Sequence, residues 1–296
     1  MPLNRRQLLL GAALPAAVRA QSGAKMYLCM HQTTTAAAGY RRSLEGYAKA
    51  GIRYVEVIPP HVDEFVKQEG MPAARRLLTD LGIKAVASGG GRGVVQPKPE
   101  RAALEEIKRL GETLAALGVD RMVCPCNTAG KFTLDDYPRT VDSLRQVGEI
   151  LKPYKVVAMV EFMRGSTLVG TLPTALKVTR EVNHPNVMPM FDFYHFGAGL
   201  SRLEDLDLVR EGELHHVHFQ DVPDIPRELL DNGTRDVPGD GVLPLVRILQ
   251  ILDRKKYRGP LSVELFYPHL QKGDPFEVAR RIRQQSEPIM KRAGVA

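Results

Sequence analysis

Residues 187–221 read VMPMFDFYHFGAGLSRLEDLDLVREGELHHVHFQD and contain two short apolar runs that end in polar side chains of the kind that bind metals. The first run carries Asp192 and leads to His195, and the second carries His218. An amphipathic segment at residues 201–210 separates them, so the stretch is typical of a strand, a helix and a second strand. We therefore expect these polar side chains at the carboxyl ends of parallel strands, where parallel barrels carry their active sites.

The same alternation of strand and helix extends over the rest of the chain. Short runs rich in Val, Ile and Met predict strands, and the amphipathic segments between them predict helices. The strands are expected at residues 25–33, 54–58, 83–88, 121–126, 155–163, 187–194, 215–221 and 260–266. The helices are expected at residues 43–51, 65–81, 97–117, 134–151, 167–182, 201–210, 242–257 and 275–292.

These repeated units predict an α/β fold, a single (β/α)8 TIM barrel over residues 25–296. No linker or change of composition divides this region. A doubly wound open sheet is the main rival fold, but it would leave some of the strand–helix units unplaced.

The first 20 residues have the composition of an export signal. Arg5 and Arg6 precede the apolar segment LLLGAALPAAV, and small residues surround a cleavage position after Ala20. This order predicts a twin-arginine-type signal peptide at residues 1–20 and hence an exported, periplasmic protein. A basic tail or a short anchor helix is the alternative. Beyond this segment no apolar run is long enough to span a bilayer, so we expect no stable membrane anchor.

Charge and cysteine content narrow the choice of partners. The formal net charge is +7, and loss of residues 1–20, with three arginines and no acids, leaves 7 − 3 = +4. The remaining basic residues alternate with acids, as at residues 100–109, so we expect no nucleic-acid partner. Cys29, Cys124 and Cys126 do not form a disulfide framework, and we expect buried thiols.

Two glutamates complete a set of four potential metal ligands. Glu161 in VVAMVEF and Glu264 in PLSVELF lie near the ends of predicted strands, as do Asp192 and His218. Each residue alone has a structural explanation, but four consecutive strands of a closed barrel bring their carboxyl ends onto one arc. Carboxylates with one imidazole suit a single divalent ion, Mn²⁺, Zn²⁺, Co²⁺ or Mg²⁺, rather than a thiolate-bound structural zinc.

Other polar positions near the predicted strand ends leave several interpretations open. His31 and Glu56 either face the pocket as substrate-binding residues or have structural roles. His216 alternates with His218 and is expected deeper in the fold, in packing rather than ligation. The glycine-rich segment at residues 88–93 is expected to be a flexible loop, because no helix follows it directly.

Several segments resemble one known family. They are FDFYHFGAG (191–199), HVHFQD (216–221), PRELLDNG (226–233), TRDVPGDG (234–241) and YRGPLSVELF (257–266). In these segments the chain resembles the xylose isomerase-like TIM-barrel superfamily of sugar phosphate isomerases and epimerases, and within it the 2-keto-myo-inositol isomerase type. The resemblance implies that Glu161, Asp192, His218 and Glu264 bind one divalent metal.

The resemblance also implies roles in the reaction. Glu161 and Glu264 would double as the catalytic acid–base pair, and His195 and Arg235 would bind substrate hydroxyls or the enediolate oxygen. This chemistry is physically consistent, because a Lewis acid stabilises an enediolate while two carboxylates remove and return a proton. We therefore expect a metal-dependent isomerase or epimerase of a sugar or cyclitol ketone.

Three other functions remain in competition. A lyase or dehydratase acting on keto-sugars or 3-keto-glycosides would use the same site and expel a β-leaving group. An apurinic-site endonuclease shares the barrel, but the predicted second and third strands lack the histidines that its metal cluster requires. A sugar-binding protein that retains the metal without catalysis is the third. The sequence leaves open whether the protein is a homo-oligomer.

Overall fold

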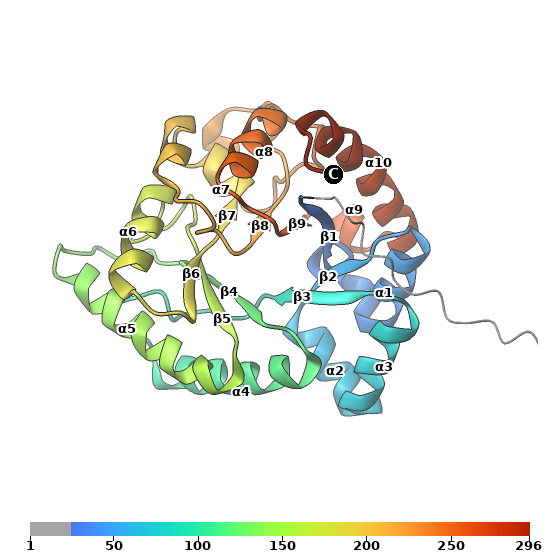
Figure 1. Cartoon of the computed structure of the whole chain (residues 1–296), viewed down its shortest axis with the longest axis horizontal. Helices are drawn as coiled ribbons and strands as arrows, with labels where there is room; N and C mark the ends of the chain where they lie inside the picture. The colour runs from blue at the N-terminus through green and yellow to red at the C-terminus, as the bar shows by residue number, and fades with distance from the viewer. Residues whose placement is uncertain (1–24) are drawn as a thin grey trace, which may run out of the picture.

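A parallel sheet rolled into a barrel, with helices around it, carries the fold (Figure 1). The computed structural model describes residues 25–296, so the predicted signal at residues 1–20 lies outside the described residues and stays a prediction. The strands are β1 Tyr27–His31, β2 Tyr54–Val57, β3 Lys84–Ser88, β4 Arg121–Pro125, β5 Val157–Glu161, β6 Val187–Pro189, β7 Phe191–Asp192, β8 Val217–His218 and β9 Pro260–Val263. They follow the order β6-β5-β4-β3-β2-β1-β9-β8-β7, which confirms the predicted barrel.

The barrel closes through one segment of chain that changes its pairing partner. β6 pairs with β5, whereas β7 pairs with β8, and only Met190 separates β6 from β7. The backbone N–H of Met190 donates to Val160 O at 3.2 Å, and that of Phe191 donates to His216 O at 3.1 Å. Pro189, which precedes the change, already faces the other side, because its carbonyl accepts a hydrogen bond from the His215 N–H at 3.3 Å. The predicted strand at 187–194 is therefore two short strands that join the two edges of the sheet.

The helices surround the sheet in the alternation that the sequence predicted. They are α1 Gly39–Lys49, α2 Pro59–Glu69, α3 Met71–Asp80, α4 Arg101–Leu117, α5 Asp136–Leu151, α6 Leu172–Val182, α7 Phe193–Ala198, α8 Leu245–Arg254, α9 Pro268–Gln271 and α10 Pro275–Ala293. Four short 3₁₀ helices join them: η1 Gln32–Ala38, η2 Lys152–Tyr154, η3 Leu203–Leu208 and η4 Arg227–Leu229.

Two predicted helices differ from the observed ones. The helix expected at 65–81 is two helices, α2 and α3, because Gly70 adopts a φ of 84° between them. The helix expected at 201–210 is only the 3₁₀ helix η3. The helical turn after β7 comes directly after Asp192, whose side chain accepts a hydrogen bond from the His195 N–H and so caps α7.

Two of the buried hydrophobic clusters lie on opposite sides of the strands. A large cluster fills the space between sheet and helices, and a separate small cluster contains Ala87, Val123, Met159 and Met190. Because side chains alternate along a strand, Met159 shares the face of Glu161. The small cluster therefore lies inside the barrel, beneath the carboxyl ends of β5 and β7.

The cysteines agree with a further expectation. Cys29, Cys124 and Cys126 are free and buried, which confirms the prediction of buried thiols. Among residues 25–296 no helix is both long enough and apolar enough to cross a bilayer.

Gly91, after β3, packs too closely against β4 to carry a side chain. Its N–H donates to Val123 O at 2.9 Å, and an added Cβ would lie 2.2 Å from the Cys124 sulfur. We expect Gly91→Ala to lower the free energy of unfolding by about 1–3 kcal/mol, because the strand or the loop must shift. Chemical denaturation measures this change. Gly165→Ala is the control, since no atom lies within 4 Å of its added Cβ; an equal loss in both variants would contradict the close approach.

Candidate metal centre

The carboxyl ends of four strands deliver the predicted ligands to one place. Glu161 ends β5, Asp192 ends β7, His218 ends β8, and Glu264 directly follows β9. One potential ligand atom from each of the four lies within 4.8 Å of all the others. The parallel register positions them, since Asp192 pairs with His218 across β7 and β8.

One imidazole nitrogen stands at the centre of this group. His218 Nδ1 lies 3.0 Å from Glu161 Oε1, 3.3 Å from Asp192 Oδ2 and 3.4 Å from Glu264 Oε2. Asp192 and His218 are buried, and the Glu264 side chain retains 13% of its exposure. Three carboxylates and one nitrogen therefore share a pocket with restricted access to water.

Burial and neighbouring charges act in opposite directions on these groups. Burial raises the pKa of Glu161 to about 7, against the lowering effect of His218. Burial also disfavours ionisation of Glu264 and Asp192, but neighbouring positive charge holds the pKa of each below its usual value. For Glu264 this charge comes mainly from Arg235. For Asp192 it comes from His195 and Arg235. Acidic groups this close to one another require positive charge nearby if all are to ionise.

Arg235 supplies part of that charge. Its Nη1 contacts both Glu264 Oε2 and Asp192 Oδ2, the latter at 3.3 Å. Its Nη2 donates to Asn232 Oδ1 at 2.6 Å and lies 3.0 Å from His195 Nε2. Arg235 is only 1% exposed. The guanidinium group is therefore fixed beside two of the candidate ligands by bonds in several directions.

Two aromatic rings hold the same guanidinium group by their faces. The Arg235 Cζ lies 4.8 Å from the ring centre of Phe266 and 5.2 Å from that of Tyr194. Cation–π attraction and the hydrogen bonds together define the plane of the group. This loop residue is consequently as well ordered by its contacts as a residue on a strand.

His195 reaches the same cluster from the first turn of α7. Its backbone N–H donates to Asp192 Oδ1 at 2.6 Å, and its Nδ1 accepts a hydrogen bond from the Arg164 N–H at 3.3 Å. The structure thus brings together His195 and Arg235, two of the four predicted substrate-binding residues, at one side of the candidate ligands.

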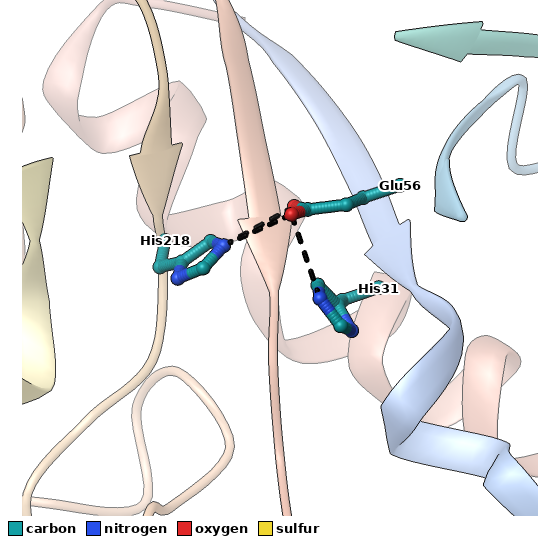
Figure 2. A group of neighbouring side chains, drawn as sticks. All are labelled: His31, Glu56 and His218. Carbon is teal, nitrogen blue, oxygen red and sulfur yellow. Dashed lines mark hydrogen bonds and ion pairs between the residues drawn. The ribbon is translucent and has the colours of Figure 1, made fainter. Parts of the chain in front are cut away.

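His31 and Glu56 lie on the other side of His218 (Figure 2). His31 Nε2 is 3.5 Å from Glu264 Oε1 and 3.4 Å from Glu56 Oε1. Among the described residues that line the cavity at the barrel mouth, His31 is present and Glu56 is not. Glu56 is instead fully buried, with His216 Nε2 and Ser262 Oγ each 2.7 Å from its Oε2.

Two polar residues near the ligands had no assigned role in the sequence interpretation. Gln220 Nε2 donates to Asp192 Oδ2 at 2.7 Å, and Ser262 is the buried partner of Glu56. Alternation along β9 places Ser262 on the face of Glu264, and Gln220 lies two residues after His218. That periodicity was the available signal, but the polar partner of each residue is distant in the sequence.

A cavity of about 470 Å³ opens above the cluster. Its polar side is formed by Glu161, His218, Glu264, Arg235 and Asn232, with His31 at the edge. The rest of the lining includes the apolar residues Ile58, Pro59, Leu110, Val123, Pro125 and Met163, together with Arg92, Glu106 and Asn127. A cavity of this size with a few convergent polar groups is typical of a small-molecule site.

The donor set fits a divalent cation. Oxygen donors from three carboxylates with one imidazole nitrogen suit borderline or hard ions, and the atoms already lie within a ligand shell of one another. His218 also has the hydrogen-bonded second nitrogen that metal-binding histidines commonly have.

Comparisons with known proteins agree with this geometry. Inosose isomerase of Halalkalibacterium halodurans is 30% identical over 252 residues, covering 82% of this chain and 89% of that protein. 3-Dehydroshikimate dehydratase of Pseudomonas putida is 26% identical, covering 75% of this chain but 35% of that protein. The solved structure of IolI protein with a zinc atom has a TM-score of 0.84 and 26% identity, covering 90% of this chain and 99% of that one.

A family model described as a xylose isomerase-like TIM barrel matches residues 44–287. This match spans most of the strands and all four candidate ligands, and it confirms the resemblance carried by the segments between residues 191 and 266. The chain therefore belongs to the xylose isomerase-like TIM-barrel family.

Proposed function

We propose that the protein is a divalent-metal-dependent isomerase or epimerase that acts on a sugar or cyclitol ketone. The observation that carries this proposal is the convergence of three carboxylates and the His218 imidazole on one point at the barrel mouth, beside a fixed guanidinium group. The relatives named inosose isomerase support a ring-shaped polyol ketone as substrate.

Glu161, Asp192, His218 and Glu264 would hold one divalent ion, Mn²⁺, Zn²⁺, Co²⁺ or Mg²⁺. When bound, the ion supplies a Lewis acid that stabilises the negative charge of an enediolate. The zinc atom in the similar IolI structure supports the assignment of a metal to this fold.

The protein's own carboxylates would move the proton. Glu264 follows β9, which is the direct neighbour of β8, whereas Glu161 ends β5, which is reached from β8 through β7 and β6 around the barrel. Both glutamates line the cavity. A proton removed from one carbon of the substrate by one of these groups would be returned to the neighbouring carbon, or to the other face, by the same or the second group.

Arg235 would orient the substrate, and His195, which is buried and does not border the cavity, would hold the guanidinium group in place. The guanidinium group presents N–H donors beside Glu264, where negative charge develops on substrate oxygen, and its contacts hold it in place before the reaction. His195 borders the same donors and is fixed by the helical turn of α7.

A lyase or dehydratase is the second candidate, because relatives named 3-dehydroshikimate dehydratase and inosose dehydratase share the family with the isomerases. In that reaction the same abstraction of a proton leads to loss of a leaving group from the β-carbon instead of reprotonation. A keto-sugar or 3-keto-glycoside would be the substrate.

We expect the metal-loaded protein, incubated with keto-inositols in deuterated water, to exchange ring protons for deuterium without losing water. Treatment with a chelator should abolish the exchange, and added Mn²⁺, Co²⁺, Zn²⁺ or Mg²⁺ should restore it, because the Lewis acid is removed and returned. NMR and mass spectrometry follow the reaction. Release of water or of an aglycone from a 3-keto-glucoside would favour the lyase, and undiminished turnover after chelation would refute the metal-dependent reaction.

We expect Glu264→Gln to lower kcat by at least about 10²-fold, since a general acid–base group typically contributes that much. The amide cannot accept a proton and is a weaker metal ligand. Steady-state kinetics with parallel metal analysis separates the two effects. Glu228→Gln serves as control, because Glu228 is exposed on the loop that carries Arg235; equal activity of the Glu264 and Glu228 variants would contradict the proposed role.

We expect Arg235→Lys to lower kcat/KM by about 10²-fold or more while the metal content stays unchanged. Lysine keeps the charge but cannot contact Glu264, Asn232 and His195 at once, so the donor aimed at the substrate oxygen is displaced. Arg227→Lys, a change at an exposed arginine of the same loop, should behave as the unchanged protein. Full activity of Arg235→Lys would show that the several N–H donors of the guanidinium group have no part in the reaction.

A further inference from the structure

A buried carboxylate lies directly behind the candidate metal ligand His218 (Figure 2). Glu56 is 0% exposed, and donors from three other strands or their ends surround it. Its Oε2 lies 2.7 Å from His216 Nε2, 2.7 Å from Ser262 Oγ and 3.2 Å from His218 Nε2. Its Oε1 lies 3.3 Å from His218 Nε2 and 3.4 Å from His31 Nε2. The contacts use the acceptor capacity of a carboxylate almost fully.

The two nitrogens of His218 face different surroundings. Nδ1 faces Glu161, Asp192 and Glu264, whereas Nε2 faces Glu56. A neutral imidazole carries its proton on one nitrogen and has a lone pair on the other. If Nδ1 is to offer its lone pair to a cation among the three carboxylates, the proton must be on Nε2. The acceptor that receives it there is Glu56.

We propose that Glu56 is a positioning residue of the metal centre, which holds His218 in the tautomer and orientation that direct Nδ1 at the ion. This inference rests on the metal site of the proposed function. It replaces a direct substrate contact for Glu56, because the carboxylate is enclosed behind His218 and does not border the cavity. Carboxylates that accept from the second nitrogen of a metal-bound histidine commonly fix its tautomer and raise its basicity.

His31 extends the same support to a second ligand. Its Nδ1 accepts a hydrogen bond from the Thr33 N–H at 3.1 Å, so a neutral His31 carries its proton on Nε2. Its Nε2 lies 3.4 Å from Glu56 Oε1 and 3.5 Å from Glu264 Oε1. The His31 ring is thus in contact with both the buried carboxylate and a second candidate ligand on a different strand.

The test compares the zinc affinity of the full chain with that of the Glu56→Gln variant, by competition with a chromogenic chelator. We expect an affinity lower by about 10- to 100-fold, because the amide does not select the required tautomer as a carboxylate does. Ser262→Ala is the matched control: it removes one bond to the same oxygen of Glu56 but leaves both contacts with His218, and we expect a much smaller loss of affinity.

Thermal unfolding of the metal-free variants distinguishes positioning from stability alone. Zinc affinity that is unchanged in Glu56→Gln, with or without a lower melting temperature, would overturn the inference while leaving the metal centre intact. If the unchanged protein itself binds no zinc, the proposed function fails instead, so the two failures are distinguishable.

A second measurement needs no variant and decides the question if Glu56→Gln does not fold. In the zinc-loaded protein labelled with ¹⁵N-histidine, NMR shifts report the state of each ring nitrogen. We expect His218 to carry its proton on Nε2 and to bind zinc through Nδ1. A proton on Nδ1, or zinc bound at Nε2, would refute the role of Glu56.

Discussion

Repulsion among acidic side chains is the constraint around which the barrel mouth is built. Glu161, Asp192 and Glu264 place oxygens around one nitrogen of His218 in a site with little exposure to water. Charges this close in a medium of low polarity repel strongly, and they persist as anions only with positive partners. Arg235 is such a partner within the chain, and protonated His218 is another when no ion is bound. In the proposed function a divalent cation takes the place of the His218 proton.

A second buried acidic group, below the barrel mouth, also needs positive or hydrogen-bonding partners. One side of the barrel interior is apolar, with Met159, Met190 and their neighbours, and gives no hydrogen bonds to a charged group. The other side contains Glu56, and the chain surrounds this carboxylate with imidazole and hydroxyl donors. This carboxylate is costly to remove, because its loss would leave several buried donors without their acceptor. This polar half of the interior therefore gives the ligands a rigid support.

The sequence predicted the barrel and the meeting of the four candidate ligands because both follow from local periodicity. A run that ends in Asp192 or His218 places that side chain at a strand end whichever strands lie beside it. The change of partner at Met190 could not be predicted, since it depends on β5 and β8, which are distant in the sequence. The helix expected at 201–210 was wrong because amphipathic spacing does not reveal that the capping of α7 by Asp192 begins a helical turn earlier.

The enclosed position of Glu56 could not be predicted from the sequence for a similar reason. Alternation along β2 showed which face its side chain takes, but not its depth, which depends on β8 and β9 on the other side of β1. His216 was correctly expected deeper than His218, yet its partner Glu56 lies 160 residues away. Contacts across the interior of a barrel join residues that are far apart in the sequence, and the periodicity of a single strand does not predict them.

The cavity lining has two parts of different origin. The acidic part comes from the strands of the second half of the chain, whereas much of the apolar part, Ile58, Pro59, Leu110 and Val123, comes from the first half. Substitutions at these apolar positions can therefore reshape the space for a ligand without disturbing the groups that would perform the chemistry. Such a separation gives a lineage freedom to exchange one substrate for another while it inherits the same reactive centre.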